Sequence, residues 1–365
     1  MRFRRSSHIT SYWDEGKLVF ENFHTRVAVT AAPETASILS FFDSWRSPRE
    51  LMAQLPAYSP RSVRRAIGEL SRQTLLLGEG TPAARDDARA AKLWAHWLPH
   101  GSFHFSTRDT PVVPTAREGA VLRSFLAESP QPSFFKRYPM AKRVPLPPQQ
   151  PPGDQFPRVL LARRTHRAYS KAPVPLPAIS TLLYFTWGIT GGVRSPVLGW
   201  LPRRTSPSGG ARQPGEVYLL ALRVQGLAPG LYHYDTRRHC LELLRRGRFA
   251  KRAVEYCGGQ SHPGKAAALF LMTAVFPRVM WKYRAPRAYR IVLVDAGHLC
   301  QTFLLTATWL GLAPFSVMAI SESSIERDLG IDGVSESVLY VAGVGIPLAP
   351  GARAAADRNR FSASL

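Results

Sequence analysis

The second half of the chain holds several short segments whose residue types could do chemistry. The first runs from Arg163 to Arg167 (RRTHR) and places three guanidinium groups and a hydroxyl within five residues. Arginine binds phosphate through paired hydrogen bonds and keeps its charge when it is partly buried. The segment therefore suits a phosphate monoester beside a heteroaromatic carbonyl, although a solvated basic turn has the same composition.

Two glycine-containing segments could bring the backbone close to a ligand. Residues 205–212 (TSPSGGAR) precede an apolar strand, and small residues let backbone N–H groups approach a planar molecule. Gly343 and Gly345 (GVGIP) end the last apolar strand and would allow a similar approach. Each segment alone could equally be an ordinary turn.

Lys282 and Tyr283 are the residue types that proton transfer at carbon requires. Successive residues of a regular strand point to opposite faces, so both could reach one substrate only from a loop or bulge, which we predict here. A surface Lys-Tyr pair is the plainer interpretation. Asp295 to His298, with Gln301, falls on a long apolar helix, where a buried histidine with satisfied hydrogen bonds is the simpler expectation.

The elements around these segments predict a mixed α+β domain over residues 158–350. Apolar periodicity predicts helices and strands in alternation along this stretch. The expected helices span 176–190, 248–257, 289–310 and 323–329, and the expected strands span 216–224, 240–244, 268–276, 313–320 and 337–344.

The order of expected strands and helices in residues 1–100 predicts a separate winged-helix-like unit. Strands are expected at 17–20 and 26–29, then helices at 34–45, from Ser47 and from Ser59 to Gln73, and a closing β-wing from Thr74. Ser47 as N-cap, with Glu50 three residues later, forms a capping-box pattern. A helix is expected at 83–97. Residues 101–157 are expected to connect the domains and to include a Pro-rich linker at 146–157, and a tail is expected at 351–365.

Composition limits the partners. The net charge of +23, from 48 Lys plus Arg against 25 Asp plus Glu, favours anionic partners, although an Arg-rich coding bias would produce the same balance. Three widely spaced cysteines without a CxxC pair predict neither a disulfide framework nor a metal site, and suit a reducing, cytoplasmic setting. Gly311 and Pro314 interrupt the longest apolar run, so we expect a buried helix and strand there and no membrane span.

The order of the motifs resembles a known family. RRTHR, PLPAISTLLYFTWGIT, PSGGARQPGEVYLL, GLYHYD, the Lys-Tyr segment, AYRIVLVDAGHLCQTFLLTATWLGL and ESVLYVAGVGIP follow one another from Arg158 to Pro347. This order resembles the nitroreductase-like flavoproteins, and more narrowly the SagB/ThcOx-type branch, which includes azoline dehydrogenases of ribosomal peptide (RiPP) pathways. The resemblance implies an α+β sandwich, with a central mixed sheet and flanking helices, that forms a homodimer with two FMN sites at the interface.

The resemblance also implies roles for particular residues. Residues that would hold the FMN phosphate and the pyrimidine edge are Arg163, Arg164, Thr165 and Arg167. Residues that would approach the flavin, from the partner subunit, are Pro207, Ser208, Gly209 and Gly210, with Gly343 and Gly345 at the matching strand end. Lys282 and Tyr283 stand at the place of a catalytic pair. Thr165 replaces a common Ser, and Thr302 replaces a frequent Asn.

The implied reaction is oxidation of a peptide-borne azoline to an azole. A proton would leave Cα to Lys282 or Tyr283, a hydride would pass to FMN, and oxygen would reoxidise the flavin. A cyclodehydratase would be a partner, and residues 15–80 would grip a leader peptide by strand addition, or else would only pack on the catalytic domain.

Other functions stay open at this point. The same flavin site could dehydrogenate an aminoacyl or carrier-bound substrate, or reduce a nitro compound or quinone with NAD(P)H, because one fold hosts many reactions. A DNA-binding winged helix with Arg61, Arg64, Arg65 and Arg72 is the alternative of another class. It is disfavoured because these arginines need only form the solvated face opposite Val63 and Ile67.

Overall fold

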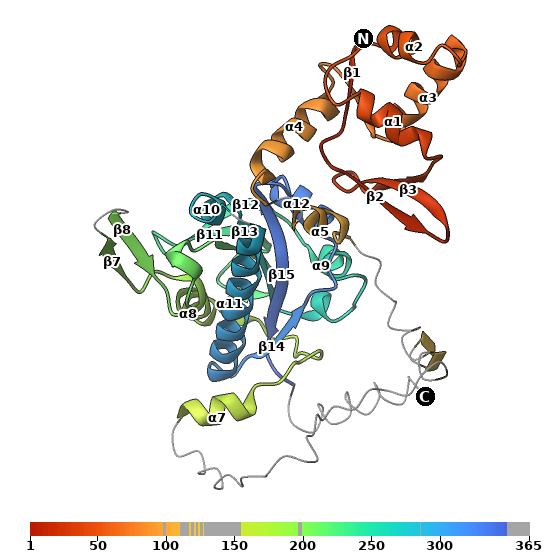
Figure 1. Ribbon diagram of the computed structural model, residues 1–365. Helices are drawn as coiled ribbons and strands as arrows, with labels where there is room; N and C mark the ends of the chain where they lie inside the picture. The colour runs from red at the N-terminus through yellow and green to blue at the C-terminus, as the bar shows by residue number, and fades with distance from the viewer. Residues whose placement is uncertain are drawn as a thin grey trace, which may run out of the picture. The chain divides into compact units, whose positions relative to one another are not determined.

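The computed structural model describes residues 1–97, 100–109, 155–195, 199–284 and 286–348, with a few positions between 117 and 127. Most of the expected connecting region, including the Pro-rich stretch at 146–154, and the expected tail at 351–365 lie outside the described residues. The chain forms two compact units (Figure 1). Among the described residues, the first unit contains those of 1–108 and 276–291, and the second contains those of 109–275 and 292–365.

A six-stranded sheet organises the second unit. Its strand order is β12-β11-β9-β13-β15-β14. The strands are β9 (Gly215–Ala221), β11 (Gly230–Asp235), β12 (Cys240–Arg246), β13 (Ala268–Val275), β14 (Ala313–Val317) and β15 (Glu336–Gly345). The predicted α+β class is confirmed, but all pairings in this sheet are antiparallel where we expected a mixed sheet. The connections explain this, since β11 and β12 form a hairpin and α11 takes the chain back along the sheet between β13 and β14, so that each strand runs opposite to its neighbours.

Helices cover both faces of this sheet. Val217 and Leu219 of β9 face the apolar cluster formed with α8 (Leu176–Trp187) and α11 (Tyr289–Trp309). Tyr218 and Leu220 face the opposite cluster, formed with α9 (Ala250–Tyr256) and α12 (Glu322–Leu329). Figure 1 shows α11 lying along the sheet beside β15. The result is a three-layer sandwich whose central strands are buried on both sides.

Helix α11 is, within the described ranges, long and apolar enough to cross a membrane by length and composition alone. Its residues Phe303, Leu304 and Ala307 are buried against the sheet. Core helices of this length pass the same test, and the apolar run predicted as a buried helix followed by a strand corresponds to the end of α11 and to β14.

Smaller elements complete the second unit. Helix α7 begins at Gln155, so the last residues of the expected extended linker are helical. The remaining elements are α7 (Gln155–Ala162), the parallel pair β6 (Val174–Pro175) and β10 (Val224–Gln225), the hairpin β7 (Gly191–Ser195) and β8 (Gly199–Arg203), and the 3-10 turns η1 (Gly209–Ala211) and η2 (Pro263–Lys265).

The first unit combines a small antiparallel sheet with helices. Its sheet β2-β3-β4 precedes the helices, and β5 pairs with the N-terminal strand β1, which the sequence did not predict. The strands are β1 (Phe3–Arg5), β2 (Ile9–Asp14), β3 (Lys17–Asn22), β4 (Val27–Thr30) and β5 (Leu76–Gly78). The helices are α1 (Glu34–Phe41), α2 (Pro48–Gln54), α3 (Pro60–Arg72), α4 (Pro82–Trp94), α5 (His100–Ser106) and α10 (Pro277–Met280), with the 3-10 turn η3 (Pro286–Ala288).

Helix starts in this unit follow the predicted capping. Ser47 and Glu50 form a reciprocal capping box at α2, and the Ser59 side chain accepts a hydrogen bond from a backbone N–H of α3. Val63 and Ile67 are buried on one face of α3, as their spacing predicts. Helix α3 is therefore an amphipathic helix with a solvated basic face.

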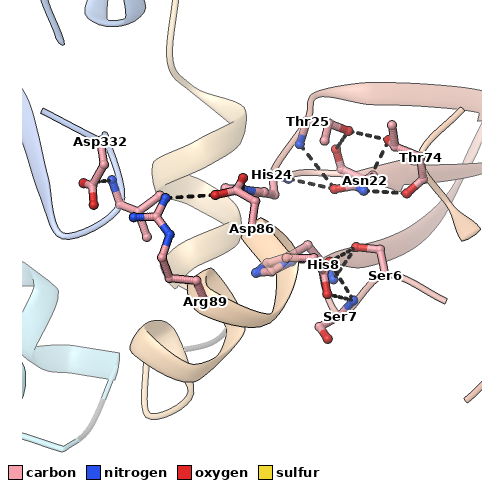
Figure 2. A network of polar contacts seen from close by, with 12 residues as sticks. Ser6, Ser7, His8, Asn22, His24, Thr25, Thr74, Asp86, Arg89 and Asp332 are labelled. Atoms are coloured by element: carbon pink, nitrogen blue, oxygen red, sulfur yellow. Dashed lines mark hydrogen bonds and ion pairs between the residues drawn. The ribbon is translucent and has the colours of Figure 1, made fainter. Parts of the chain in front are cut away.

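Polar contacts connect the turns of the first unit (Figure 2). The Asn22 side chain donates to the Thr74 carbonyl at 2.8 Å and accepts from the His24 backbone at 3.1 Å. His24 in turn lies 2.9 Å from the Asp86 carboxylate on α4. These bonds hold the β3–β4 turn against the residues before β5 and against α4.

One histidine of the large sheet is enclosed by two carboxylates. The His233 ring on β11 lies 3.3 Å from Glu216 on β9 and 2.8 Å from Glu242 on β12. The hydrogen bond to Glu216, with the second one to Glu242, raises the pKa of His233 from 6.5 to about 9. The charged histidine therefore stabilises the folded state fully below pH 6.5, and this contribution is lost as the pH rises through about 9.

We predict that a His233→Gln variant will show a flatter dependence of stability on pH. Wild type should lose about 1–2 kcal/mol more unfolding free energy than the variant between about pH 6.5 and 10, because only wild type releases a proton from this group. Thermal unfolding of both proteins across this range measures the difference. Parallel pH curves would contradict the prediction.

Candidate functional site

The RRTHR segment lies beside the ends of two strands of the large sheet. It follows α7, and the Arg163 backbone N–H still donates to the Val159 carbonyl at 3.0 Å. The His166 N–H then donates to the Pro314 carbonyl of β14 at 2.8 Å. Three residues after the motif, Ser170 donates to the Ile346 carbonyl, just past β15, at 2.9 Å. Backbone bonds to β14 and to the end of β15 thus position the motif.

Tyr169 is the side chain that seats the motif against β15. Its hydroxyl donates to the His166 carbonyl at 2.5 Å, and burial raises its pKa far above the usual range. A Cβ atom at Gly345 would lie 2.6 Å from the Tyr169 ring, and one at Gly343 would lie 2.2 Å from the Phe315 ring. The side-chain space at both glycines is therefore filled by aromatic rings of this chain, so any contact they make with a flavin would be through their backbone.

The cations of the motif are accessible. Arg164, Thr165 and Arg167 are exposed and Arg163 is half-buried. The Arg164 guanidinium donates to the Leu161 and Arg163 carbonyls, both at 2.8 Å, at the end of α7. Three guanidiniums and a hydroxyl beside a sheet edge form a donor set that fits a phosphate group.

The PSGG segment is a strained loop between β8 and β9. Gly210 has φ 62°, and the non-glycine residues Ala211 and Gln213 also have left-handed φ values of 58° and 46°. Such conformations persist only where surrounding contacts enforce them. Strained backbone of this kind concentrates at ligand-binding sites, and no sequence feature beyond the two glycines predicts it.

Helix α11 supplies the contacts that enforce this loop. The Ser208 hydroxyl donates to the Asp295 carboxylate at 2.6 Å, and the Gly209 N–H donates to the same carboxylate at 3.3 Å. Two residues before Ser208, the Ser206 hydroxyl lies 2.7 Å from the Thr302 hydroxyl of α11. The Asp295 segment, which the sequence suggested was only core, therefore touches the predicted flavin loop. The expectation of a buried histidine is wrong, because the His298 side chain, like that of Gln301 on the same helix, is exposed.

Lys282 and Tyr283 lie together in the first unit. They form a turn after α10, and both backbone N–H groups donate to the Val279 carbonyl, at 3.1 and 2.9 Å. The Lys282 ammonium lies 5.3 Å from the centre of the Tyr283 ring. Trp97 donates to the Tyr283 carbonyl at 3.1 Å. The prediction that this pair lies outside regular strand is confirmed.

Comparison with known proteins now assigns the family. The Nitroreductase family model matches residues 160–346, about half of the chain, from the RRTHR segment to the end of β15. This chain belongs to the nitroreductase family. The matched region contains both glycine segments, the Lys-Tyr pair and α11, so the family assignment covers every predicted site residue.

Curated relatives support the same assignment. The trifolitoxin-processing protein TfxB of Rhizobium leguminosarum bv. trifolii is 32% identical over 179 residues, which cover 47% of this chain and 48% of TfxB. The putative nitroreductase MJ1384 of Methanocaldococcus jannaschii is 30% identical over 173 residues, 47% of this chain and 83% of that protein. The microcin B17-processing protein McbC of Escherichia coli is 28% identical, over 38% of this chain and 53% of McbC.

The matches to processing proteins support the SagB/ThcOx-type branch of the nitroreductase family that the motif order predicted. The chain spans about half the length of TfxB. Among solved structures, a putative nitroreductase from Anabaena variabilis matches with a TM-score of 0.45 and 26% identity, over 53% of this chain and 38% of that one.

The structure groups the predicted nitroreductase site residues in two sets. Within the second unit, RRTHR lies by the end of β15 next to Gly345, and PSGG is bonded to α11. The Lys282–Tyr283 pair belongs to the first unit. Sequence reasoning missed the contact of Tyr169 with Gly345 and that of Asp295 with Ser208, since each joins residues far apart in the chain.

We predict that Gly345→Ala will destabilise the second unit by about 1–3 kcal/mol, because the added methyl must displace the Tyr169 ring. A Gly345→Ala/Tyr169→Ala double variant should lose less stability than the sum of the losses in the two single variants, because the clash is gone. Gly68→Ala on α3 is the control, since nothing lies within 4 Å of its Cβ position. Thermal unfolding of wild type, Gly345→Ala, Tyr169→Ala, the double variant and the control measures these losses, and additive losses would contradict the account.

Proposed function

We propose that this nitroreductase-family protein is an FMN-dependent dehydrogenase or oxidase that converts a peptide-borne azoline to an azole in natural-product biosynthesis. The observation that carries the proposal is the pairing, in one compact unit, of an accessible arginine motif seated on β14 and β15 with a strained PSGG loop bonded to α11. The similarity to proteins named for the processing of trifolitoxin and microcin B17 favours the peptide substrate.

The RRTHR and PSGG segments would hold different parts of the flavin. Three arginines and a threonine would bind the phosphate and the pyrimidine edge: Arg163, Arg164, Arg167 and Thr165. The backbone of Pro207 to Gly210 would approach the ring from the partner subunit of a homodimer. Bound FMN supplies two-electron chemistry, because it accepts a hydride equivalent.

Lys282 and Tyr283 would handle the proton of the same oxidation. An azoline loses one proton and one hydride equivalent when it becomes an azole, and the gain of aromaticity favours the change. Either the Lys282 amine or the Tyr283 phenol oxygen would take the proton from Cα, and the 5.3 Å approach of the ammonium to the Tyr283 ring lets each influence the other.

Apolar surface on the second unit supports the homodimer. On α11, Val294 and Trp309 are exposed, and on α7, Phe156 and Leu161 are exposed. A cavity of about 460 Å³ lies between these two helices and is lined by Val159, Leu305 and Trp309 among others. Phe156 and Trp309 line this cavity, and exposed apolar surface of this kind is typical of an interface, so we propose that a second copy covers it.

The remaining partners follow from the chemistry. An azoline forms when a Cys, Ser or Thr side chain closes on the preceding carbonyl with loss of water, so a cyclodehydratase would supply the substrate. Strands β2 and β4 are the edges of the small sheet in the first unit, and an extended leader peptide could add to one of them. We also propose a cytoplasmic setting, which three widely spaced cysteines without a CxxC pair suit.

We predict that the protein will bind FMN more tightly than riboflavin, and that Arg164→Ala and Arg167→Ala will each reduce this preference by about tenfold. The reason is that FMN loses a charge-assisted bond to its phosphate that riboflavin does not make, whatever contact both ligands make at the pyrimidine edge. Fluorescence titration of the apoprotein with both ligands measures the two affinities.

Arg237→Ala is the matched control, because it removes an exposed arginine from the β11–β12 turn of the same unit. It should leave both affinities unchanged. An equal loss in the control would show that general positive charge, and not the motif, attracts FMN.

We predict that Lys282→Ala and Tyr283→Phe will both retain FMN. The variant that removes the base should oxidise the azoline about 10²-fold more slowly or worse, because general base catalysis usually contributes a factor of this size. The measurement is single-turnover bleaching of the flavin by a thiazoline-bearing peptide. Unchanged rates in both variants would remove the pair from the mechanism, and the larger loss identifies the base.

A further inference from the structure

Asp295 is a carboxylate in an unusual place. It lies on α11, whose composition is otherwise apolar over most of its length, and it is only 5% exposed. Burial raises the pKa of its carboxyl group, against the opposing effect of the hydrogen bonds from Ser208 and Gly209. A buried carboxylate is costly unless it is well hydrogen-bonded, so its contacts should explain its presence.

The hydrogen bonds around Asp295 have a defined direction. The Ser208 hydroxyl oxygen accepts from the Gln213 backbone N–H at 2.9 Å, which leaves its proton for the Asp295 Oδ2 atom at 2.6 Å. The Gly209 N–H donates to Oδ1 at 3.3 Å. Both neighbours thus donate to Asp295, and only a group with two acceptor oxygens satisfies them.

These two bonds act on the strained part of the loop. Gly209 starts the turn that contains the left-handed residues Gly210 and Ala211, and Gln213 is the third left-handed residue. Ser208 joins the two ends, because it accepts from Gln213 and donates to Asp295. Without the carboxylate, the loop would lose two of the contacts that oppose relaxation to ordinary backbone angles.

We propose that Asp295 is a positioning residue that holds the PSGG loop in the conformation that receives the flavin ring. This inference rests on the proposed flavin function of that loop. It separates two parts of recognition, since the arginine motif would sense the phosphate while Asp295, through Ser208 and Gly209, would set the affinity for the ring.

Asp295→Asn tests this division of roles. An amide offers one acceptor oxygen and places an N–H₂ group against a donor, so one of the two bonds is lost. FMN and riboflavin should both bind about tenfold more weakly, with their ratio unchanged, in contrast to the arginine variants. Asp235→Asn, at the turn between β11 and β12, makes the same change of charge as a control and should leave both affinities as in wild type.

Hydrogen exchange of the flavin-free protein gives a second readout. The backbone N–H groups of Ala211, Arg212 and Gln213 all donate within the loop, at 2.9 to 3.3 Å. In Asp295→Asn and in Ser208→Ala these amides should exchange at least about tenfold faster, while those of β13 keep their protection.

The outcomes separate this inference from the proposed function. A wild-type protein that binds neither flavin would overturn the function and, with it, the role in flavin affinity. A wild-type protein that binds both, together with an Asp295→Asn variant that binds them equally well and shows unchanged loop exchange, would overturn the inference alone. A changed FMN-to-riboflavin ratio in Asp295→Asn would also overturn it, because Asp295 would then act on the phosphate.

Discussion

Burial of both faces of β9 and β13 is the constraint on which the second unit depends. Every residue of β9 is buried, as is β13 up to its last residue. A sheet that excludes water on both sides needs a helical layer on each, and α8 with α11 and α9 with α12 provide them. Binding groups are therefore displaced to the strand ends and to the loops between strands and helices, which is where RRTHR and PSGG lie.

Two local devices then hold those binding groups in place. At the end of β15 the absence of a side chain at Gly345 leaves room for the Tyr169 ring, and the hydroxyl of this residue donates a hydrogen bond to the arginine segment at His166. On α11 a buried carboxylate holds the strained glycine loop. Each device joins residues far apart in the chain, so the site depends on the tertiary fold being formed first.

Local patterns in the sequence predicted the elements well and the contacts poorly. The start of α11 at Tyr289 and the capping box at Ser47 follow from apolar spacing and capping residues. The loop at Lys282 was predicted for another reason, that two neighbouring side chains can reach one substrate only outside a regular strand. Strand β11 was not predicted, because Gly230, His233 and Asp235 interrupt its apolar alternation, although its partners bury it. No local pattern could show that Asp295 meets Ser208, since that contact exists only once α11 packs beside the loop.

The central claim is that this nitroreductase-family protein carries FMN, and the visible absorption spectrum of the purified protein tests it most directly. We predict flavin bands in the visible range, with a released chromophore whose mass is that of FMN, either as purified or after incubation with FMN and removal of the excess. A colourless protein that takes up no FMN under these conditions would contradict the account.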